Sequence, residues 1–312
     1  RFRLGPQTSK SMRLGFSERS LRRQYPDLEA HDVRVHLSIC LGKDCGLLKK
    51  GDEISWEDLA MFTATQPVIP SFGKSIETWN ISFDQNGFPS SWKADGVEFL
   101  AESIRPCFGR AITENDKGAK LEEKMKVWMY PELKLEDINI QGDITKADSG
   151  WICTGEGMLT ARYKVADVAE VAMTWTVTED GRLCLREKFT RFPGTPPPFR
   201  IGVEFAMPQG FEELDFHGSG PFETYSDRKS SGRIARYVQQ IAQQYHSEYV
   251  RPQESGNHTD LRYMAVKNKD GKYLVLSSDS VFSGSALPYS REDLDISIHE
   301  PGSIHLPQPL TW

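Results

Sequence analysis

Two stretches of the chain bring together most of its chemically versatile polar side chains. Residues 217–228 and residues 249–262 mix glycine and proline with carboxylates, amides, arginine, histidine and tyrosine. Such an array can bind a sugar, because planar polar groups hydrogen-bond its hydroxyls and aromatic faces pack against its C–H edges. The alternative is that Glu223, Asp227 and Arg228 only tie a buried turn together by charge-assisted hydrogen bonds. The residue types alone leave both interpretations open.

The sequence contains none of the short motifs that mark nucleotide binding, zinc proteases or serine hydrolases. Its cysteines are odd in number and irregularly spaced, which favours free thiols over a disulfide framework; they are Cys40, Cys45, Cys107, Cys153 and Cys184. Cys40 and Cys45 form the only close pair, and no second pair or histidine completes a zinc site. We therefore predict that this chain itself holds no metal or other cofactor.

Composition excludes several classes of partner. The 312 residues carry 38 Lys+Arg against 44 Asp+Glu, a net charge of −6, which argues against nucleic-acid binding. No run of about eighteen apolar residues occurs, so we expect no membrane span. Aromatic residues make up 11% of the chain, enough to build a packed core. Because the chain begins at Arg1, we expect a piece of a longer protein, and the compartment stays open between cytoplasm and bacterial-type periplasm.

The sequence pattern predicts that the elements which position these side chains are mainly strands. Apolar and polar residues alternate with period two, as in a half-buried strand, over 33–39, 79–83, 171–177, 201–205 and 261–265. Residues 273–276 are a continuous apolar run, which predicts a buried strand. His36 falls on the polar face of the first of these strands. Asn86-Gly87, Asp180-Gly181 and Asp270-Gly271 are typical of hairpin turns. Many short strands separated by glycine and proline predict a large antiparallel β-sandwich.

Three segments do not follow that alternation. Leu121, Met125, Trp128 and Met129 have the spacing of one helical face, which predicts a short amphipathic helix. Residues 234–241 show helical spacing as well. The first thirty residues are basic and polar, typical of a solvated charge run or the remnant of a strand.

Four motifs, in order along the chain, resemble one family. The pattern Gly218-x-Gly220-Pro221-x-Glu223-x-Tyr225-x-Asp227-Arg228 is followed by Pro252-Gln253-Glu254-x-Gly256-Asn257-x-Thr259-Asp260-x-Arg262. Together with residues 105–118 and 282–294 they resemble the C-terminal domain of β-galactosidases of glycoside hydrolase family 2, which is the small chain of two-subunit forms. The resemblance covers about residues 56–312. It departs at Gly109, where the family usually has Trp, and at Ile112, where it often has Pro.

The resemblance implies a fold and a division of the chain. The fold would be an all-β, two-layer antiparallel supersandwich of the galactose mutarotase type, in which residues 232–244 run extended. Residues 1–64 would be the end of an immunoglobulin-like β-domain, with its last strand at 53–60 and a linker over 63–70. Residues 71–312 would be the small-chain domain. The family continues beyond the position of Trp312 into a glycine-rich segment, so the resemblance also implies a C-terminal truncation.

The resemblance further implies a non-catalytic role. Retaining glycosidases need two carboxylates about 5–5.5 Å apart, and in this family both lie in an upstream barrel domain. The chain would then shape the active-site cleft of a β-galactosidase and its subunit contacts. The expected partners are the barrel domain, a β-galactoside and further copies of the complete enzyme. Any Mg or Na that the complete enzyme uses is expected in other domains. The predicted substrate-rim residues are Arg251, Gln253, Glu254, Asn257 and His258.

Glu254 is expected in an exposed or mobile loop, because burying residues 251–257 would leave many polar groups to satisfy. The alternative is that Glu254 braces the fold by pairing with Arg251 or Arg262. Two other functions stay open on the same fold. An aldose epimerase would pair a histidine acid, His217 or His246, with a glutamate base, Glu204 or Glu223. A carbohydrate-binding module would bind sugar without turnover.

Overall fold

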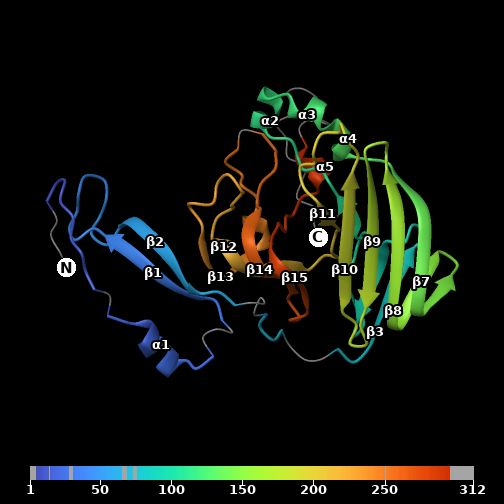
Figure 1. Ribbon diagram of the computed structural model, residues 1–312, viewed down its shortest axis with the longest axis horizontal. Coiled ribbons are helices and arrows are strands. Elements are labelled where there is room, and N and C mark those ends of the chain that lie inside the picture. The colour runs from blue at the N-terminus through green and yellow to red at the C-terminus, as the bar shows by residue number, and fades with distance from the viewer. Residues whose placement is uncertain are drawn as a thin grey trace.

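A computed structural model describes residues 5–13, 15–27, 31–64, 69–72, 76–249 and 251–295. Every strand pairing in these ranges is antiparallel. Figure 1 shows two main sheets side by side, with short helices above them and an N-terminal hairpin at the left of the view. The predicted all-β sandwich is therefore confirmed. No helix in the described ranges is both long and apolar enough to cross a membrane.

The larger sheet is built around one long strand. Its strands are β3 (Trp79–Asp84), β4 (Pro89–Ala94), β5 (Val97–Glu98), β7 (Leu133–Ala147), β8 (Gly150–Val165), β9 (Ala169–Val177) and β10 (Leu183–Arg191). Strand β7 pairs along one edge of β8, while β3 and β9 share the other edge. On β9 the alternate residues Val171, Met173, Trp175 and Val177 are buried, as the period-two pattern predicts. This face carries the larger part of the core.

The smaller sheet has the order β13-β12-β14-β15. Its strands are β12 (Phe211–Gly220), β13 (Arg233–Gln240), β14 (His258–Asn268) and β15 (Tyr273–Gly284), and the short strands β6 (Arg105–Cys107) and β11 (Gly202–Glu204) pair with each other nearby. Trp79, Trp92 and Phe205 pack against the apolar cores of both sheets and so join them. The helical spacing at 234–241 does not produce a helix: β13 is extended, and only Ile241–Gln243 forms a 3₁₀ turn, η2. Pairing of β13 with β12 overrides the local propensity.

The predicted hairpin turns are confirmed. Asn86-Gly87 joins β3 to β4, Asp180-Gly181 joins β9 to β10, and Asp270-Gly271 joins β14 to β15. The glycine of the middle turn has φ +77°, a conformation that costs other residues energy. A Cβ there would also lie 2.6 Å from the Trp79 ring. These turns fix the register of the strands that surround the site.

Short helices cover one end of the sandwich. They are α2 (Glu114–Gly118), α3 (Leu121–Lys124), α4 (Lys126–Met129) and α5 (Arg291–Leu294). The predicted helix over 121–129 is present but broken at Met125, whose φ of −104° and ψ of 3° separate α3 from α4. Trp128 is nevertheless fully buried, as its place on the apolar face predicts. A further helix, α1 (Glu18–Gln24), was not predicted within the basic segment; its start is fixed by a capping box between Ser17 and Ser20.

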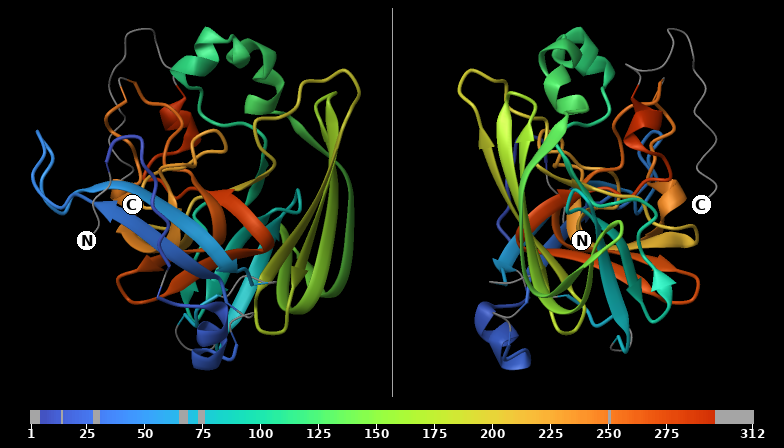
Figure 2. Two further views of the ribbon diagram at one scale, coloured as in Figure 1. Left: turned by 60° about the vertical axis from the view of Figure 1, so that its left-hand side comes forward. Right: turned by 90° about the vertical axis from the view of Figure 1, so that its right-hand side faces the viewer.

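The N-terminal hairpin consists of β1 (Val33–Cys40) and β2 (Glu53–Phe62), which includes the strand predicted at 53–60. Figure 2 shows it lying across the smaller sheet rather than within either sheet. That this hairpin ends an immunoglobulin-like domain at residue 64 stays a prediction. Residues 65–68 of the predicted linker, and residues 296–312 at the expected truncation, lie outside the described residues.

Candidate functional site: an inter-sheet cavity

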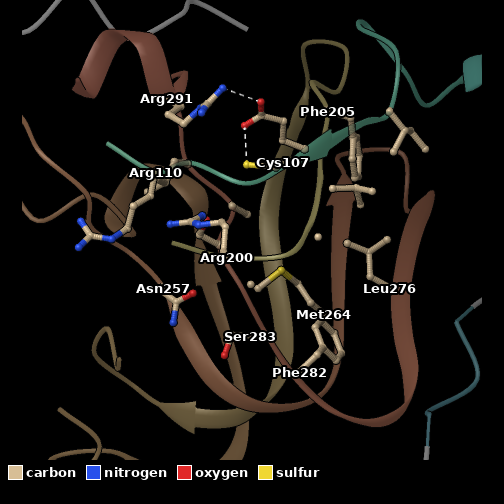
Figure 3. A pocket seen from close by; sticks show the side chains of 18 of the residues that line it. Cys107, Arg110, Arg200, Phe205, Asn257, Met264, Leu276, Phe282, Ser283 and Arg291 are labelled. Atoms are coloured by element: carbon tan, nitrogen blue, oxygen red, sulfur yellow. Dashed lines mark hydrogen bonds and ion pairs between the residues drawn. The ribbon is translucent and has the colours of Figure 1, made fainter. Parts of the chain in front are cut away.

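A large cavity lies between the two sheets, with a volume of about 3490 Å³. Figure 3 shows its two kinds of lining. At one end the side chains are apolar, and these include Phe205, Met264, Leu276 and Phe282. At the other end they are polar or charged, and these include Cys107, Arg110, Arg200, Asn257 and Arg291. We call this space the inter-sheet cavity. Residues from both polar stretches of the sequence, 217–228 and 249–262, line its polar end.

Glu254 lies at this polar end and is not in an exposed loop. Its carboxylate Oε1 is 2.7 Å from Nη2 of Arg200, and its side chain is only 10% exposed. The expectation that Glu254 is exposed is therefore wrong. A brace does form, but its partner is Arg200, which precedes β11, rather than Arg251 or Arg262.

The loop around Glu254 is buried, and distant groups satisfy several of its polar atoms, although the buried hydroxyl of Ser255 has no hydrogen-bond partner among the described residues. The side-chain Oε1 of Gln253 accepts a hydrogen bond from the backbone N–H of Glu114 at 3.1 Å. The backbone N–H of Gly256 donates to Oε2 of Glu223 at 2.7 Å. Burial of a polar loop costs little once its donors and acceptors are paired. Gln253, Glu254 and Asn257 all line the inter-sheet cavity, so three of the five predicted rim residues are brought together.

The other two predicted rim residues lie elsewhere. Arg251 is exposed, with its Nε 3.4 Å from a carboxylate oxygen of Glu114. His258 is only 1% exposed, so it belongs to the core and not to a substrate rim. Its ring lies 4.1 Å from that of Phe216, and its Nε2 is 2.8 Å from Oε1 of Gln244. Burial lowers the pKa of His258. The family resemblance predicts it at the end of the 251–258 rim loop, but as the first residue of β14 it is buried.

Glu223 connects the two polar clusters. It accepts hydrogen bonds from the hydroxyl of Tyr249 at 2.7 Å and from the N–H of Gly256, and it pairs with Arg228. The first cluster thus includes the charge-assisted tie that we gave as the alternative to sugar binding. Beside it, the side-chain amide of Asn257 donates to the carbonyl oxygen of Thr224 at 2.7 Å. The polar end is consequently a rigid scaffold.

The 105–118 motif supplies a second arginine–carboxylate pair. Both terminal nitrogens of Arg110 bind the carboxylate of Asp116, at 2.7 and 2.9 Å, and the guanidinium lies over the ring of Phe199. Thr113 caps α2: its hydroxyl oxygen accepts a hydrogen bond from the N–H of Asp116, and the carboxylate of Asp116 accepts one from the N–H of Thr113. The departure at Gly109 has a steric reason in this chain. A Cβ there would lie 2.9 Å from the backbone of α4, so no larger residue fits this backbone.

One cluster at the cavity was missed from the sequence. The thiol of Cys107 donates to Oε2 of Glu204 at 3.2 Å, and Nη2 of Arg291 lies 2.9 Å from Oε1 of the same carboxylate (Figure 3). Burial, reinforced by the negative charge of Glu204, raises the pKa of Cys107 to about 12. A thiol in that state is not a nucleophile near neutral pH. The three residues come from separate segments, and no spacing along the chain relates them.

The residues proposed for an epimerase do not converge. His217 lies on β12, away from the cavity lining, and burial together with Arg262 lowers its pKa. Glu204 is occupied by Cys107 and Arg291. His246 is exposed beside Tyr249, whose hydroxyl binds Glu223. Among the described residues, the cavity lining contains no histidine, and no group of three or more His, Cys, Asp or Glu is placed to hold a metal ion.

Comparison with known proteins agrees with this fold and with these motifs. Residues 75–303 match the sequence model of the family described as beta galactosidase small chain. The chain is 26% identical over 288 residues to a beta-galactosidase of Priestia megaterium, covering 87% of this chain and 27% of that protein. It is 29% identical over 225 residues to one of Streptococcus thermophilus, covering 70% and 21%, and 28% identical over 269 residues to one of Kluyveromyces lactis, covering 78% and 25%.

The chain thus spans about a quarter of the length of these relatives. The family match covers well over half of the chain, and it includes both sheets of the sandwich and the inter-sheet cavity. The chain belongs to the β-galactosidase small-chain family.

Proposed function

We propose that this chain is the non-catalytic C-terminal part of a β-galactosidase that hydrolyses terminal β-D-galactosides. The observation that carries the proposal is the family match over residues 75–303, combined with relatives named beta-galactosidase that are about four times longer than the aligned part. The catalytic carboxylates would lie in a barrel domain of the same enzyme. That barrel domain, the galactoside and further copies of the enzyme are the partners in this proposal, and any Mg or Na would belong to other domains.

The carboxylates of the cavity support a non-catalytic role. A retaining glycosidase needs one carboxylate as nucleophile and a second group as proton donor, about 5–5.5 Å apart. Three of the carboxylates that line the inter-sheet cavity are already bound by guanidinium groups. Asp116 is paired with Arg110, Glu254 with Arg200, and Glu204 with Arg291. Such pairs suit a structural wall better than an acid that must give up and regain a proton.

The role we propose for the polar end is positioning. Gln253, Glu254 and Asn257 are fixed by bonds to α2, to Arg200 and to the 223–225 turn. Side chains whose rotamers are fixed in this way can present hydrogen-bonding groups to a neighbouring site at little entropic cost. In the complete enzyme this end would adjoin the sugar site of the barrel, and the sandwich would wall the cleft.

Two experiments test this proposal. The purified chain should not hydrolyse a chromogenic β-galactoside; turnover that is abolished by mutating one of its own residues would overturn the non-catalytic role. In the complete enzyme, Glu254→Gln should raise KM for the galactoside several-fold, while the control Glu170→Gln, on the outward face of β9, should leave it unchanged. A loss of stability with unchanged kinetics would show that Glu254 is only a brace.

A further inference from the structure

The rim loop before β14 is held from outside. Its residues 251–257 form no helix or strand of their own. A loop without internal pairing keeps one conformation only where neighbouring segments bind its polar groups. The 221–225 turn between β12 and β13 supplies such bonds, and the carboxylate of Glu223 reaches both sides of the loop.

Each oxygen of Glu223 binds a different side of the rim loop. Oε1 accepts a hydrogen bond from the hydroxyl of Tyr249, just before the loop, at 2.7 Å. Oε2 accepts one from the backbone N–H of Gly256, near the end of the loop, also at 2.7 Å. The Glu223 side chain is only 11% exposed, so little water competes for these bonds. One carboxylate therefore fixes how far apart the two sides of the loop lie.

The position of this carboxylate is itself fixed by its neighbours. Arg228 pairs with Glu223, and its Nη2 also donates to the hydroxyl oxygen of Tyr249 at 3.2 Å. The next residue, Thr224, is fully buried, and its backbone N–H donates to the carbonyl oxygen of Asn257 at 2.7 Å. The side-chain amide of Asn257 returns a bond to the carbonyl oxygen of Thr224. Glu223 is thus held on a rigid turn, where its side chain can orient the residues that it binds.

Gly256 lets the loop pass close to its neighbours while its N–H binds Glu223. Its φ of +71° is a conformation that residues with side chains rarely adopt. A Cβ at this position would lie 2.6 Å from the carbonyl oxygen of Gln244 and 2.6 Å from the side chain of Leu287. A larger residue would displace the loop, and with it the N–H that Glu223 binds.

Glu223 acts from outside the inter-sheet cavity. The described residues that line the cavity include Tyr249, Gln253, Glu254 and Asn257, but not Glu223. We propose that Glu223 is a positioning residue: it fixes the conformation in which the rim loop presents its side chains to the galactoside, and it does not itself touch the sugar. This inference rests on the proposed function, because it assigns a support to the rim residues named there.

Hydrogen exchange of the full chain tests this support directly. The amides of residues 251–257 are compared by mass spectrometry in wild type, in Glu223→Gln and in the control Glu248→Gln, which changes an exposed glutamate next to Tyr249. Exchange in Glu223→Gln should rise about tenfold, as expected for loss of a hydrogen bond to a charged group, while exchange of β9 stays unchanged. Glu248→Gln should resemble the wild type. Unchanged exchange in Glu223→Gln would overturn the proposal.

A milder variant tests whether one carboxylate joins both sides of the loop. Tyr249→Phe removes only the hydroxyl that binds Oε1, and it should raise exchange at Gly256, on the other side, about threefold. In the Glu223→Gln background the same substitution should add nothing, because the connection is already lost. Independent, additive effects of the two substitutions would also overturn the proposal.

Kinetics of the complete enzyme separate positioning from simple stability. Glu223→Gln should raise KM for a chromogenic β-galactoside about fivefold and leave kcat within about twofold, because the rim supports binding and not the chemical step. If Glu254→Gln raises KM and Glu223→Gln does not, the positioning role is wrong while the rim stands. If neither variant raises KM, the proposed rim itself is refuted, and this inference falls with it.

Discussion

Glu187 offers a direct test of how burial governs ionisation in this sandwich. It lies on β10 opposite Met173, on the face where Leu185 and Phe189 pack against the core. Its Oε1 atom is buried, and no hydrogen-bond partner for that atom occurs in the described part of the chain. Burial alone raises the pKa of Glu187 from 4.5 to about 7. The folded state therefore favours the neutral acid.

The direction and size of the pH effect follow from this shift. Because the folded chain holds the proton more tightly than the unfolded chain, the stability that Glu187 supplies is fully present below about pH 4.5 and is lost as the pH rises through about 7. At about 1.4 kcal/mol per pKa unit, the loss is on the order of 3 kcal/mol. Above pH 8 the ionised carboxylate remains as a destabilising group.

The substitution Glu187→Gln should remove this dependence. Urea unfolding at pH 5, 6, 7 and 8 gives the free energy of unfolding of wild type and variant, and their difference cancels the titration of all other groups. We expect a small difference at pH 5 and a variant more stable by roughly 2–3 kcal/mol at pH 8. Glu170→Gln, on the exposed face of the neighbouring strand, should differ little from wild type at any pH. A difference for Glu187→Gln that is constant across the series would refute the reasoning.

Three further substitutions or reactions probe other contacts. Arg262→Met should lower the free energy of unfolding, measured with urea, by about 3 kcal/mol or more, because the carboxylate of Asp32 stays buried without its cation. Adding Asp32→Asn should restore part of this stability, and a double variant no more stable than Arg262→Met would contradict the prediction. Gly218→Ala should lower the free energy of unfolding by about 1–3 kcal/mol, since the added Cβ would lie 2.7 Å from the Leu261 side chain. The control is Gly202→Ala, whose Cβ would meet nothing within 4 Å. Equal thermal stabilities of the two variants would contradict this prediction. A thiol reagent at pH 8 should label Cys40, Cys45 and Cys184 rapidly, and Cys107 and Cys153 only on unfolding; early labelling of Cys107, read by mass spectrometry, would disprove its burial.

The sequence predicted those parts of the fold that depend on neighbouring residues. Period-two burial on β9 and the Asp-Gly turns are local, so they could be read directly from the chain. The break at Met125 was not predictable, because α3 and α4 share one apolar spacing. The capping box at Ser17 was a local signal for α1 that the basic composition of the segment concealed.

The candidate site was predicted less completely, because its pairings are long-range. Gln253, Glu254 and Asn257, which the family resemblance predicts at the substrate rim, line the inter-sheet cavity, and their contact with a substrate stays a prediction. Their burial depends on Arg200 and on α2, which lie far from them along the chain, and no periodicity shows that dependence. For the same reason His258 was misplaced.

The position of β3 has a consequence for how the chain folds. Strand β3 occupies the edge of β8 in register with it, so that Ile81 faces Cys153, 72 positions later along the chain. Strands β8, β9 and β10 are neighbours along the chain and can pair as successive hairpins. Strand β3 can pair with β8 only after a long loop has closed, and such non-local pairing slows folding. During synthesis, β3 and β4 emerge well before their partner strand. The β3–β4 hairpin should therefore acquire protection late, after the β8–β10 meander has formed.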